Sequence, residues 1–224
     1  MISQSEKQHL RQSHMAQAKK AQEKPHLYVI AGANGAGKST LRNMLFDDKS
    51  LPVTALHHDP DNVMTSLTGY IKDTQDADHA HMLAEAFDKW ELPARELSEE
   101  ILNHAITEQT DIIYERSCGV AGSLEFISEM KEKHGYEIIF YMVFTPLRIA
   151  AQRAQTRMKK EGRFTPESII QERAQALYDQ LEDFLELSDK AYLYDNAGLT
   201  PQLVFDKCHA NSTEIIRLKN LLSS

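Results

Sequence analysis

The sequence has few cysteines, no long apolar run and no excess of basic charge. It contains only two cysteines, Cys118 and Cys208, and their spacing is not that of a metal-binding motif. No apolar run approaches the roughly 20 residues that a membrane-spanning helix needs, and the N-terminus lacks the apolar region of a signal peptide. We therefore expect a cytoplasmic protein of a reducing compartment, with no structural disulfide and no membrane partner.

Acidic residues outnumber basic ones, 33 to 25, which gives a formal net charge of −8. Proteins that bind nucleic acid usually show a basic excess, so this balance argues against nucleic acid as a partner. It leaves room for a local basic pocket that takes a phosphorylated substrate. The hydrophobic content of 42% is ordinary for a globular chain, and 224 residues suffice for one α/β domain with a sizeable core.

One stretch carries the strongest chemical signal. After an apolar run, the chain reads Gly32, Ala33, Asn34, Gly35, Ala36, Gly37, Lys38, Ser39, Thr40, which is the spacing of a phosphate-binding loop (Walker A). The glycines leave room for backbone N–H groups to turn around phosphate oxygens. Lys38 would reach the β- and γ-phosphates, and the hydroxyl of Ser39 would bind Mg²⁺. The sequence thus predicts ATP and Mg²⁺ as ligands, whereas a glycine-rich turn without a ligand leaves Lys38 and Ser39 unexplained.

Segments typical of strands alternate with segments typical of helices. The expected strands are Leu27–Ala31, Pro52–His57, Asp111–Tyr114, Glu137–Phe144, Ala191–Tyr194 and Leu203–Asp206, and the last helix is capped by Asn211 or Ser212. Pro93 is expected to break a helix over residues 77–108. We interpret His57 and His58 as a strand end and not as a metal pair. The alternation predicts an α/β fold, a doubly wound, mainly parallel sheet with helices on both faces.

The first 24 residues differ in composition from the rest. They are rich in Gln, Lys, Ser and His, and Pro25 separates them from the first strand. We interpret residues 1–24 as a polar, helical N-terminal extension that is solvated or frayed; the alternative is a segment that packs over the nucleotide site or meets a partner. Residues 25–224 then form a single P-loop domain.

Carboxylates follow two predicted strands, at the edge where such sheets bind ligands. Phosphoryl transfer needs a carboxylate that orients the acceptor hydroxyl and accepts its proton, and Asp61, in a turn fixed by Pro60, is our candidate. The alternative for Asp61 is a helix N-cap. Asp59 could be a second carboxylate near Mg²⁺. Glu115 could bind a substrate hydroxyl or a water on Mg²⁺, with a solvated strand end as the alternative.

Three arginines follow later in the chain. Arg153 and Arg157 are four residues apart and share a helix face, and Arg163 comes next in a charged loop. The planar guanidinium grips phosphate oxygens in two places, and the transferring phosphoryl needs cations around it. We interpret the three arginines as a lid over ATP, and we count them and Lys38 of the phosphate loop as catalytic residues. A solvated basic helix is the alternative.

Together these landmarks resemble the zeta toxin family of P-loop kinases. The matching stretches come in the family's order and cover about Pro25 to Gly198: Ile30–Thr40, Asp59–Asp61, Glu115–Ser117, Arg153–Arg163 and Tyr194–Asn196. The sequence departs from the family's pattern at Asp59, which replaces an asparagine, and at Arg116, which replaces a threonine. It also has Glu161-Gly162-Arg163 where the lid often reads Gly-Gly-His.

The resemblance implies a P-loop kinase fold and transfer of the ATP γ-phosphate to a hydroxyl of a nucleotide sugar, UDP-N-acetylglucosamine in the best-known members. It implies Asp61 as the base, Arg153 or Arg157 together with Arg163 as phosphate clamps, and Glu115 and Ser117 as substrate-pocket residues. We group Asp59 and Arg116 with these as substrate-binding, and Arg116 could retune the substrate. Inhibitors of zeta toxins obstruct the ATP site, so the implied partner is an antitoxin, or residues 1–24 acting in cis.

Two alternatives stay open. The first is a kinase of the same architecture for another metabolite or an antibiotic. The second is a nucleotide-binding interaction module without transfer activity. A regulatory GTPase is not favoured, because the sequence has no Asn-Lys-x-Asp guanine signature.

Overall fold

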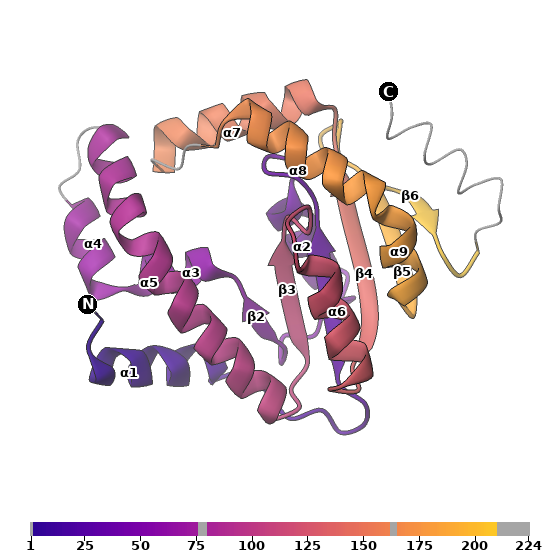
Figure 1. The fold of residues 1–224 in the computed structure, drawn as a ribbon, viewed down its shortest axis with the longest axis horizontal. Helices are drawn as coiled ribbons and strands as arrows, with labels where there is room; N and C mark the ends of the chain where they lie inside the picture. The colour runs from indigo at the N-terminus through magenta and orange to yellow at the C-terminus, as the bar shows by residue number, and fades with distance from the viewer. Residues whose placement is uncertain (1, 76–79, 162–164, 210–224) are drawn as a thin grey trace.

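A twisted sheet runs through the centre of the molecule (Figure 1). The computed structural model describes residues 2–75, 80–161 and 165–209. These residues form a six-stranded sheet of order β2-β3-β1-β4-β5-β6, in which only the β5–β6 pair is antiparallel. The strands are β1 (His26–Ala31), β2 (Leu56–His58), β3 (Ile112–Arg116), β4 (Glu137–Phe144), β5 (Lys190–Asp195) and β6 (Gln202–Asp206).

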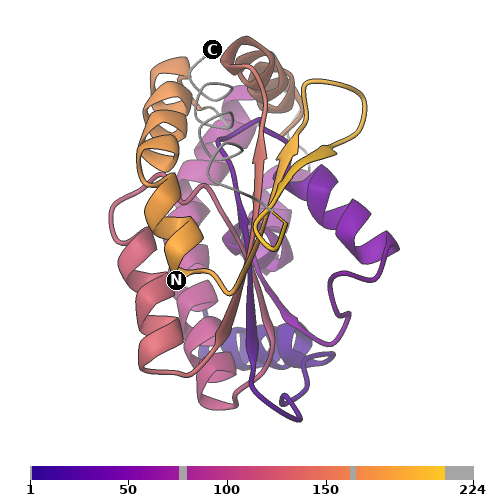
Figure 2. The same cartoon turned by 90° about the vertical axis from the view of Figure 1, so that its right-hand side faces the viewer.

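Helices lie on both sides of the sheet (Figure 2). They are α1 (Gln4–Met15), α2 (Lys38–Asp47), α3 (Pro60–Ser66), α4 (Thr68–Gln75), α5 (Ala80–Thr107), α6 (Ser123–Glu132), α7 (Leu147–Glu161), α8 (Glu167–Asp179) and α9 (Leu181–Leu187). None of these helices combines the length and the apolarity that a bilayer crossing requires. The expected doubly wound, mainly parallel α/β architecture is confirmed.

The strands are apolar because both faces of the sheet are covered. Along β1, Leu27, Val29 and Ala31 join the core cluster under α5, α6 and α9. Tyr28 and Ile30, between them in sequence, join the cluster formed with α2, α7 and α8. Successive side chains of a strand point to opposite faces, so a strand buried on both sides reads as a continuous apolar run.

The order of the strands reverses at β1. The chain leaves β1, forms β2 and β3 on one side of it, and then adds β4 and β5 on the other side. Ile30 of β1 is in register with Glu115 of β3, so the loop after β1 opens beside the carboxyl end of β3. Such a reversal leaves a crevice at the carboxyl ends of the strands, which is where α/β sheets bind ligands.

Three local expectations were wrong. Only Leu56–His58 of the second expected strand is extended, because residues 52–55 form a turn closed by the N–H of Ala55 and the carbonyl of Pro52. Helix α5 continues through Pro93. Burial of Ala94 and Leu97 beside it offsets the missing backbone hydrogen bond of the proline. Glu115 lies within β3 and not beyond it.

The N-terminal segment is helical, as expected, but it is not a solvated extension. Leu10 of α1 is 5% exposed and belongs to the core cluster, and Lys7 forms an ion pair with Glu100 of α5 at 2.6 Å. After α1, the N–H of Lys19 donates to the carbonyl of Thr54. Figure 1 shows α1 beside β2, so it packs at the edge of the sheet. The helix expected after Asn211 lies outside the described residues.

Candidate active site

The phosphate-binding loop is held by close contacts with its neighbours. Gly35 and Gly37 have φ values of +83° and +102°, in the region that favours glycine. A Cβ on Gly35 would lie 2.1 Å from the carbonyl oxygen of Ala150, and one on Gly37 would lie 2.0 Å from Nδ2 of Asn196. Both glycines are therefore required by conformation and by space. Helix α2 begins directly afterwards, at Lys38.

Lys38 lies across the loop. Its Nζ donates to the carbonyl oxygens of Gly32, at 2.9 Å, and of Ala33, at 3.3 Å. The ammonium group is thus beside the turn where a P-loop holds phosphate oxygens, next to the N-terminal end of α2. This placement agrees with the expected role of Lys38 at the β- and γ-phosphates.

Asn196 anchors the same loop from the far side. It is 3% exposed, and its Nδ2 donates to the carbonyl of Ala36 at 2.8 Å. Its backbone is fixed in turn, because its N–H donates to the carbonyl of Phe144 and its own carbonyl accepts from the hydroxyl of Thr145. The sequence marked Asn196 only as a family landmark; its contacts show that it sets the position of the loop.

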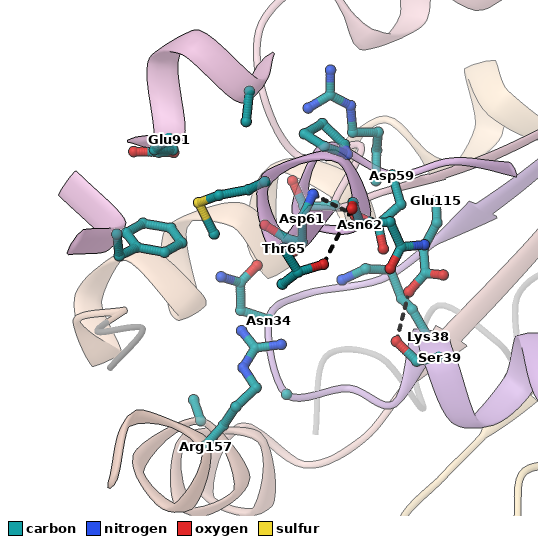
Figure 3. A pocket seen from close by; sticks show the side chains of 18 of the residues that line it. Asn34, Lys38, Ser39, Asp59, Asp61, Asn62, Thr65, Glu91, Glu115 and Arg157 are labelled. Atoms are coloured by element: carbon teal, nitrogen blue, oxygen red, sulfur yellow. Dashed lines mark hydrogen bonds between the residues drawn. The ribbon is translucent and has the colours of Figure 1, made fainter. Parts of the chain in front are cut away.

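Helix α3 begins with the Asp-Pro-Asp turn. Asp59 is its N-cap, since Oδ1 of Asp59 accepts from the N–H of Asp61 at 3.0 Å. The alternative role for Asp61, that of the helix N-cap, was therefore wrong. In Figure 3 the side chains of Asp61 and Asn34 point into the same space, to the left of Lys38 and Ser39. Burial, together with the charges of Asp61 and Glu115, raises the pKa of Asp59.

Glu115 contacts the phosphate-loop side of the site. Its Oε1 accepts from the hydroxyl of Ser39 at 2.8 Å (Figure 3), and its Oε2 accepts from Nη1 of Arg42 at 2.9 Å. Nε2 of His57 lies 3.4 Å from the same Oε2. Burial alone would raise the pKa of Glu115, but its hydrogen bonds and the charges of Arg42 and Lys38 outweigh burial and lower the pKa to about 2. Arg42 was missed by sequence reasoning, although it shares a helix face with Ser39.

A cavity of about 870 Å³ connects these groups. Most of the site residues expected from the sequence line it: Asn34, Gly35, Gly37, Lys38, Ser39, Thr40, Asp59, Asp61, Glu115, Arg116, Ser117, Arg153 and Arg157. Gly32, Ala33 and Ala36 belong to the loop but are not among the lining residues. Arg163 lies outside the described residues. Further lining residues that no motif had indicated include Tyr70, Leu83, Phe87, Glu91, Arg95 and Arg173.

Arginines dominate the wall of the cavity. Arg153 and Arg157 reach it from α7, and Nη2 of Arg153 lies 3.4 Å from the carbonyl of Gly198. Arg116 forms an ion pair with Glu99 at 2.6 Å and lies over the ring of Tyr114. The lining residues include seven lysine and arginine side chains but four carboxylates. An acidic protein therefore has a basic cavity, which suits anionic ligands.

The donors around Ser39 fit a divalent cation. Ligand atoms of His57, Asp59 and Glu115 lie within 4.8 Å of one another, and the hydroxyl of Ser39 contacts Glu115. Hydroxyl and carboxylate oxygens are the ligands that Mg²⁺ prefers. The residues at this edge of the sheet are thus compatible with Mg²⁺ beside Ser39.

Comparison with known proteins agrees with this geometry. A chain from the PezAT chromosomal toxin–antitoxin system of Streptococcus pneumoniae has the same fold, with a TM-score of 0.71 at 13% identity over 100% of this chain and 93% of that chain. The AvrRxo1-ORF1:-ORF2 complex gives 0.69 at 12% identity, over 97% and 71%, and its structure with ATP gives 0.67 at 10% identity, over 96% and 70%.

No curated protein sequence matches the chain significantly. The sequence model of the family described as zeta toxin matches residues 12–201, a range that contains the phosphate loop, the Asp-Pro-Asp turn, Glu115 and the arginines of α7. Since that range covers most of the chain, the protein belongs to the zeta toxin family.

Proposed function

We propose that the protein is an ATP- and Mg²⁺-dependent kinase that phosphorylates a hydroxyl of a nucleotide sugar such as UDP-N-acetylglucosamine. The main observation in support of this function is that one cavity brings together Lys38 of the phosphate loop, Asp61 of α3 and Arg157 of α7. A phosphate cradle, a carboxylate and arginines around one space are the groups that phosphoryl transfer needs.

Each group has a task in that reaction. The loop from Gly32 to Thr40 binds the triphosphate through its backbone N–H groups. Asp61 accepts the proton of the acceptor hydroxyl while that oxygen forms its bond to the γ-phosphorus, and the bond from the γ-phosphorus to the bridging oxygen of ADP breaks. Lys38, Arg153, Arg157 and Arg163 stabilise the charge of the transferring phosphoryl.

Ser39 would hold Mg²⁺, with Asp59 and Glu115 close by. The cation would neutralise phosphate charge when it is bound. This assignment is supported by the place of Ser39 in the phosphate loop and by the hydrogen bond that its hydroxyl donates to Glu115.

The end of the cavity away from the phosphate loop suits the acceptor. Tyr70, Leu83 and Phe87 give it an apolar wall, while Arg95 adds positive charge. A ligand that carries both a ring and an anionic group, such as a nucleotide sugar, matches this combination. We assign Asp59, Glu115, Arg116 and Ser117 to its surroundings, as the family resemblance implies.

We also propose an antitoxin as the protein partner, because a structurally similar chain comes from a toxin–antitoxin system. Among residues 2–24, none lines the cavity, which speaks against obstruction in cis by the N-terminal segment. A cytoplasmic location fits a consumer of ATP.

Transfer from γ-labelled ATP tests the proposed function. Wild type and Asp61→Ala are compared across nucleotide sugars, nucleosides and dinucleotides, with Mg²⁺ present. We expect labelled nucleotide sugar from the wild type alone, while Asp61→Ala still binds ATP. A labelled product with another acceptor would support kinase activity but would show that the substrate is not a nucleotide sugar. ATP binding without any product would favour an interaction module instead.

A further inference from the structure

Arg42 lies inside a group of potential metal ligands. It is three residues after Ser39 on α2, and its Nη1 is 2.9 Å from Oε2 of Glu115 and 3.3 Å from Nε2 of His57. Ligand atoms of His57, Asp59 and Glu115 are all within 4.8 Å of one another. One nitrogen of Arg42 therefore contacts two of the three groups that a metal ion would need there.

This contact determines how Glu115 faces Ser39. The side chain of Glu115 is only 6% exposed, so its charge needs a partner within the protein. Arg42 supplies that partner at Oε2, and this leaves Oε1 to accept the proton of the Ser39 hydroxyl at 2.8 Å. Because the Ser39 hydroxyl donates a hydrogen bond to Glu115, the lone pairs of its oxygen remain available for Mg²⁺.

The same network reaches the helix that carries Asp61. Nδ1 of His57 lies 3.2 Å from Nδ2 of Asn62, which follows Asp61 at the start of α3. A series of contacts thus runs from Ser39 through Glu115, Arg42 and His57 to α3. The guanidinium of Arg42 thus links Glu115, which contacts the phosphate loop, to His57, which contacts the start of α3.

We propose that Arg42 is a positioning residue that takes the place of a metal ion among His57, Asp59 and Glu115. Its fixed charge turns Glu115 toward Ser39 and leaves Ser39 as the single position for the cation of the reaction. Glu115 then acts through Ser39 on the phosphate side of the site. That Ser39 is where the Mg²⁺ of phosphoryl transfer binds rests on the proposed function.

Binding of Mn²⁺ tests this role without any catalysis, because the electron paramagnetic resonance signal of free Mn²⁺ falls when the ion binds. Mn²⁺ accepts the same oxygen ligands and also imidazole. The variants are Arg42→Met, which keeps a long stem without charge, and Arg42→Lys, which restores the charge. Arg148→Ala, an exposed arginine of α7, is the control. Thermal unfolding by circular dichroism checks that each variant is folded, and Arg42→Gln replaces Arg42→Met if the latter is not.

Without nucleotide, we expect Arg42→Met to bind Mn²⁺ at least about tenfold more tightly than wild type, since the three ligands lose their resident cation. A further His57→Ala change should remove that gain. With ATP, the increase in ATP affinity that Mn²⁺ causes should fall about tenfold in Arg42→Met, because Ser39 is no longer oriented. Arg42→Lys and Arg148→Ala should resemble wild type in both measurements.

An unchanged Mn²⁺ affinity in Arg42→Met would contradict the proposal. Tight Mn²⁺ binding by the nucleotide-free wild type would also contradict it, because His57, Asp59 and Glu115 would then form a metal site with Arg42 present. An unchanged effect of Mn²⁺ on ATP affinity would reduce Arg42 to a structural ion pair. These results are independent of phosphoryl transfer, so a protein that phosphorylates no acceptor would overturn the proposed function and leave this test intact.

Discussion

The two ends of the cavity are constructed differently. The phosphate end is one continuous segment, residues 32–40, whose backbone is fixed by contacts with Ala150 and Asn196. The other end is made of single side chains from several helices, such as Tyr70, Phe87 and Arg95. Phosphate can be bound by backbone groups that a short motif specifies, whereas an acceptor is recognised by side chains that only the fold brings together. We expect substitutions at the two ends to affect different ligands.

The largest expected effect is at the phosphate end. In Gly35→Ala the new Cβ would lie 2.1 Å from the backbone oxygen of Ala150, at a φ of +83°, so the loop must move. We expect ATP affinity to fall at least about a hundredfold, roughly 3 kcal/mol, with acceptor affinity unchanged. Calorimetric titration with each ligand measures both. Gly198→Ala, where a Cβ meets nothing within 4 Å, is the matched control. Wild-type ATP affinity in Gly35→Ala would show that the loop is not limited by this contact.

The second prediction concerns Glu115, at the boundary between the two ends. Its folded pKa of about 2 is below its ordinary value of 4.5, so its ionised form stabilises the fold above pH 4.5, and this contribution is lost as the pH falls toward 2. At pH 7 the contribution of ionisation is about 3 kcal/mol of unfolding free energy, and by pH 3 it falls to about half. Glu115→Gln should therefore be less stable than wild type, by a margin that narrows with acidification.

Urea unfolding of both proteins between pH 7 and pH 3 gives that margin. Glu108→Gln, which changes a carboxylate in the exposed turn after α5, is the control. If the margin between wild type and Glu115→Gln does not depend on pH, Glu115 is not held ionised by Arg42 and its neighbours.

The sequence predicted the fold and the phosphate end well for a physical reason. Strands buried on both faces are continuous apolar runs, so β4 was expected with its observed bounds, Glu137–Phe144. The phosphate loop is a local motif whose glycines are needed by its own backbone. The error at Pro93 arose because tertiary burial of α5 outweighed a local preference.

The end of the cavity that we propose for the acceptor could not be predicted in the same way. Tyr70, Phe87 and Arg95 lie on amphipathic helices, where an aromatic or charged residue at helical spacing gives no sign that it faces a cavity. Arg42 was overlooked for a similar reason, since its partner Glu115 is 73 residues away in the sequence. Such residues are identified by the packing of α4 against α5 and of α2 against the sheet, and not by any pattern.

The third prediction sharpens the comparison at the acceptor end. Arg95 lines the cavity and is paired with Glu91 on the same helix face. Because this pair is about half exposed, its loss should change stability little. For an anionic acceptor, we expect Arg95→Ala to raise the acceptor KM about tenfold, roughly 1.4 kcal/mol, and to leave the ATP KM unchanged.

Glu91→Gln should act in the opposite direction and lower the acceptor KM, since it removes a negative charge from the same wall. Arg148→Ala should change neither constant. Steady-state kinetics with each substrate varied in turn separates the two KM values. A rise in the ATP KM of Arg95→Ala would mean that the two ends do not bind separate ligands.

The smallest expected effect returns to the phosphate end. Asn196→Ala removes the hydrogen bond from Nδ2 to the carbonyl of Ala36, while the contact between Gly35 and Ala150 remains. A single neutral hydrogen bond contributes about 1 kcal/mol, so ATP affinity should fall only about fivefold. Asn196→Asp keeps the shape but cannot donate to a carbonyl, and it should lose at least as much. If Asn196→Ala instead raised the acceptor KM, the anchor behind the loop would control both ends, and the division between a backbone-built and a side-chain-built end would not hold.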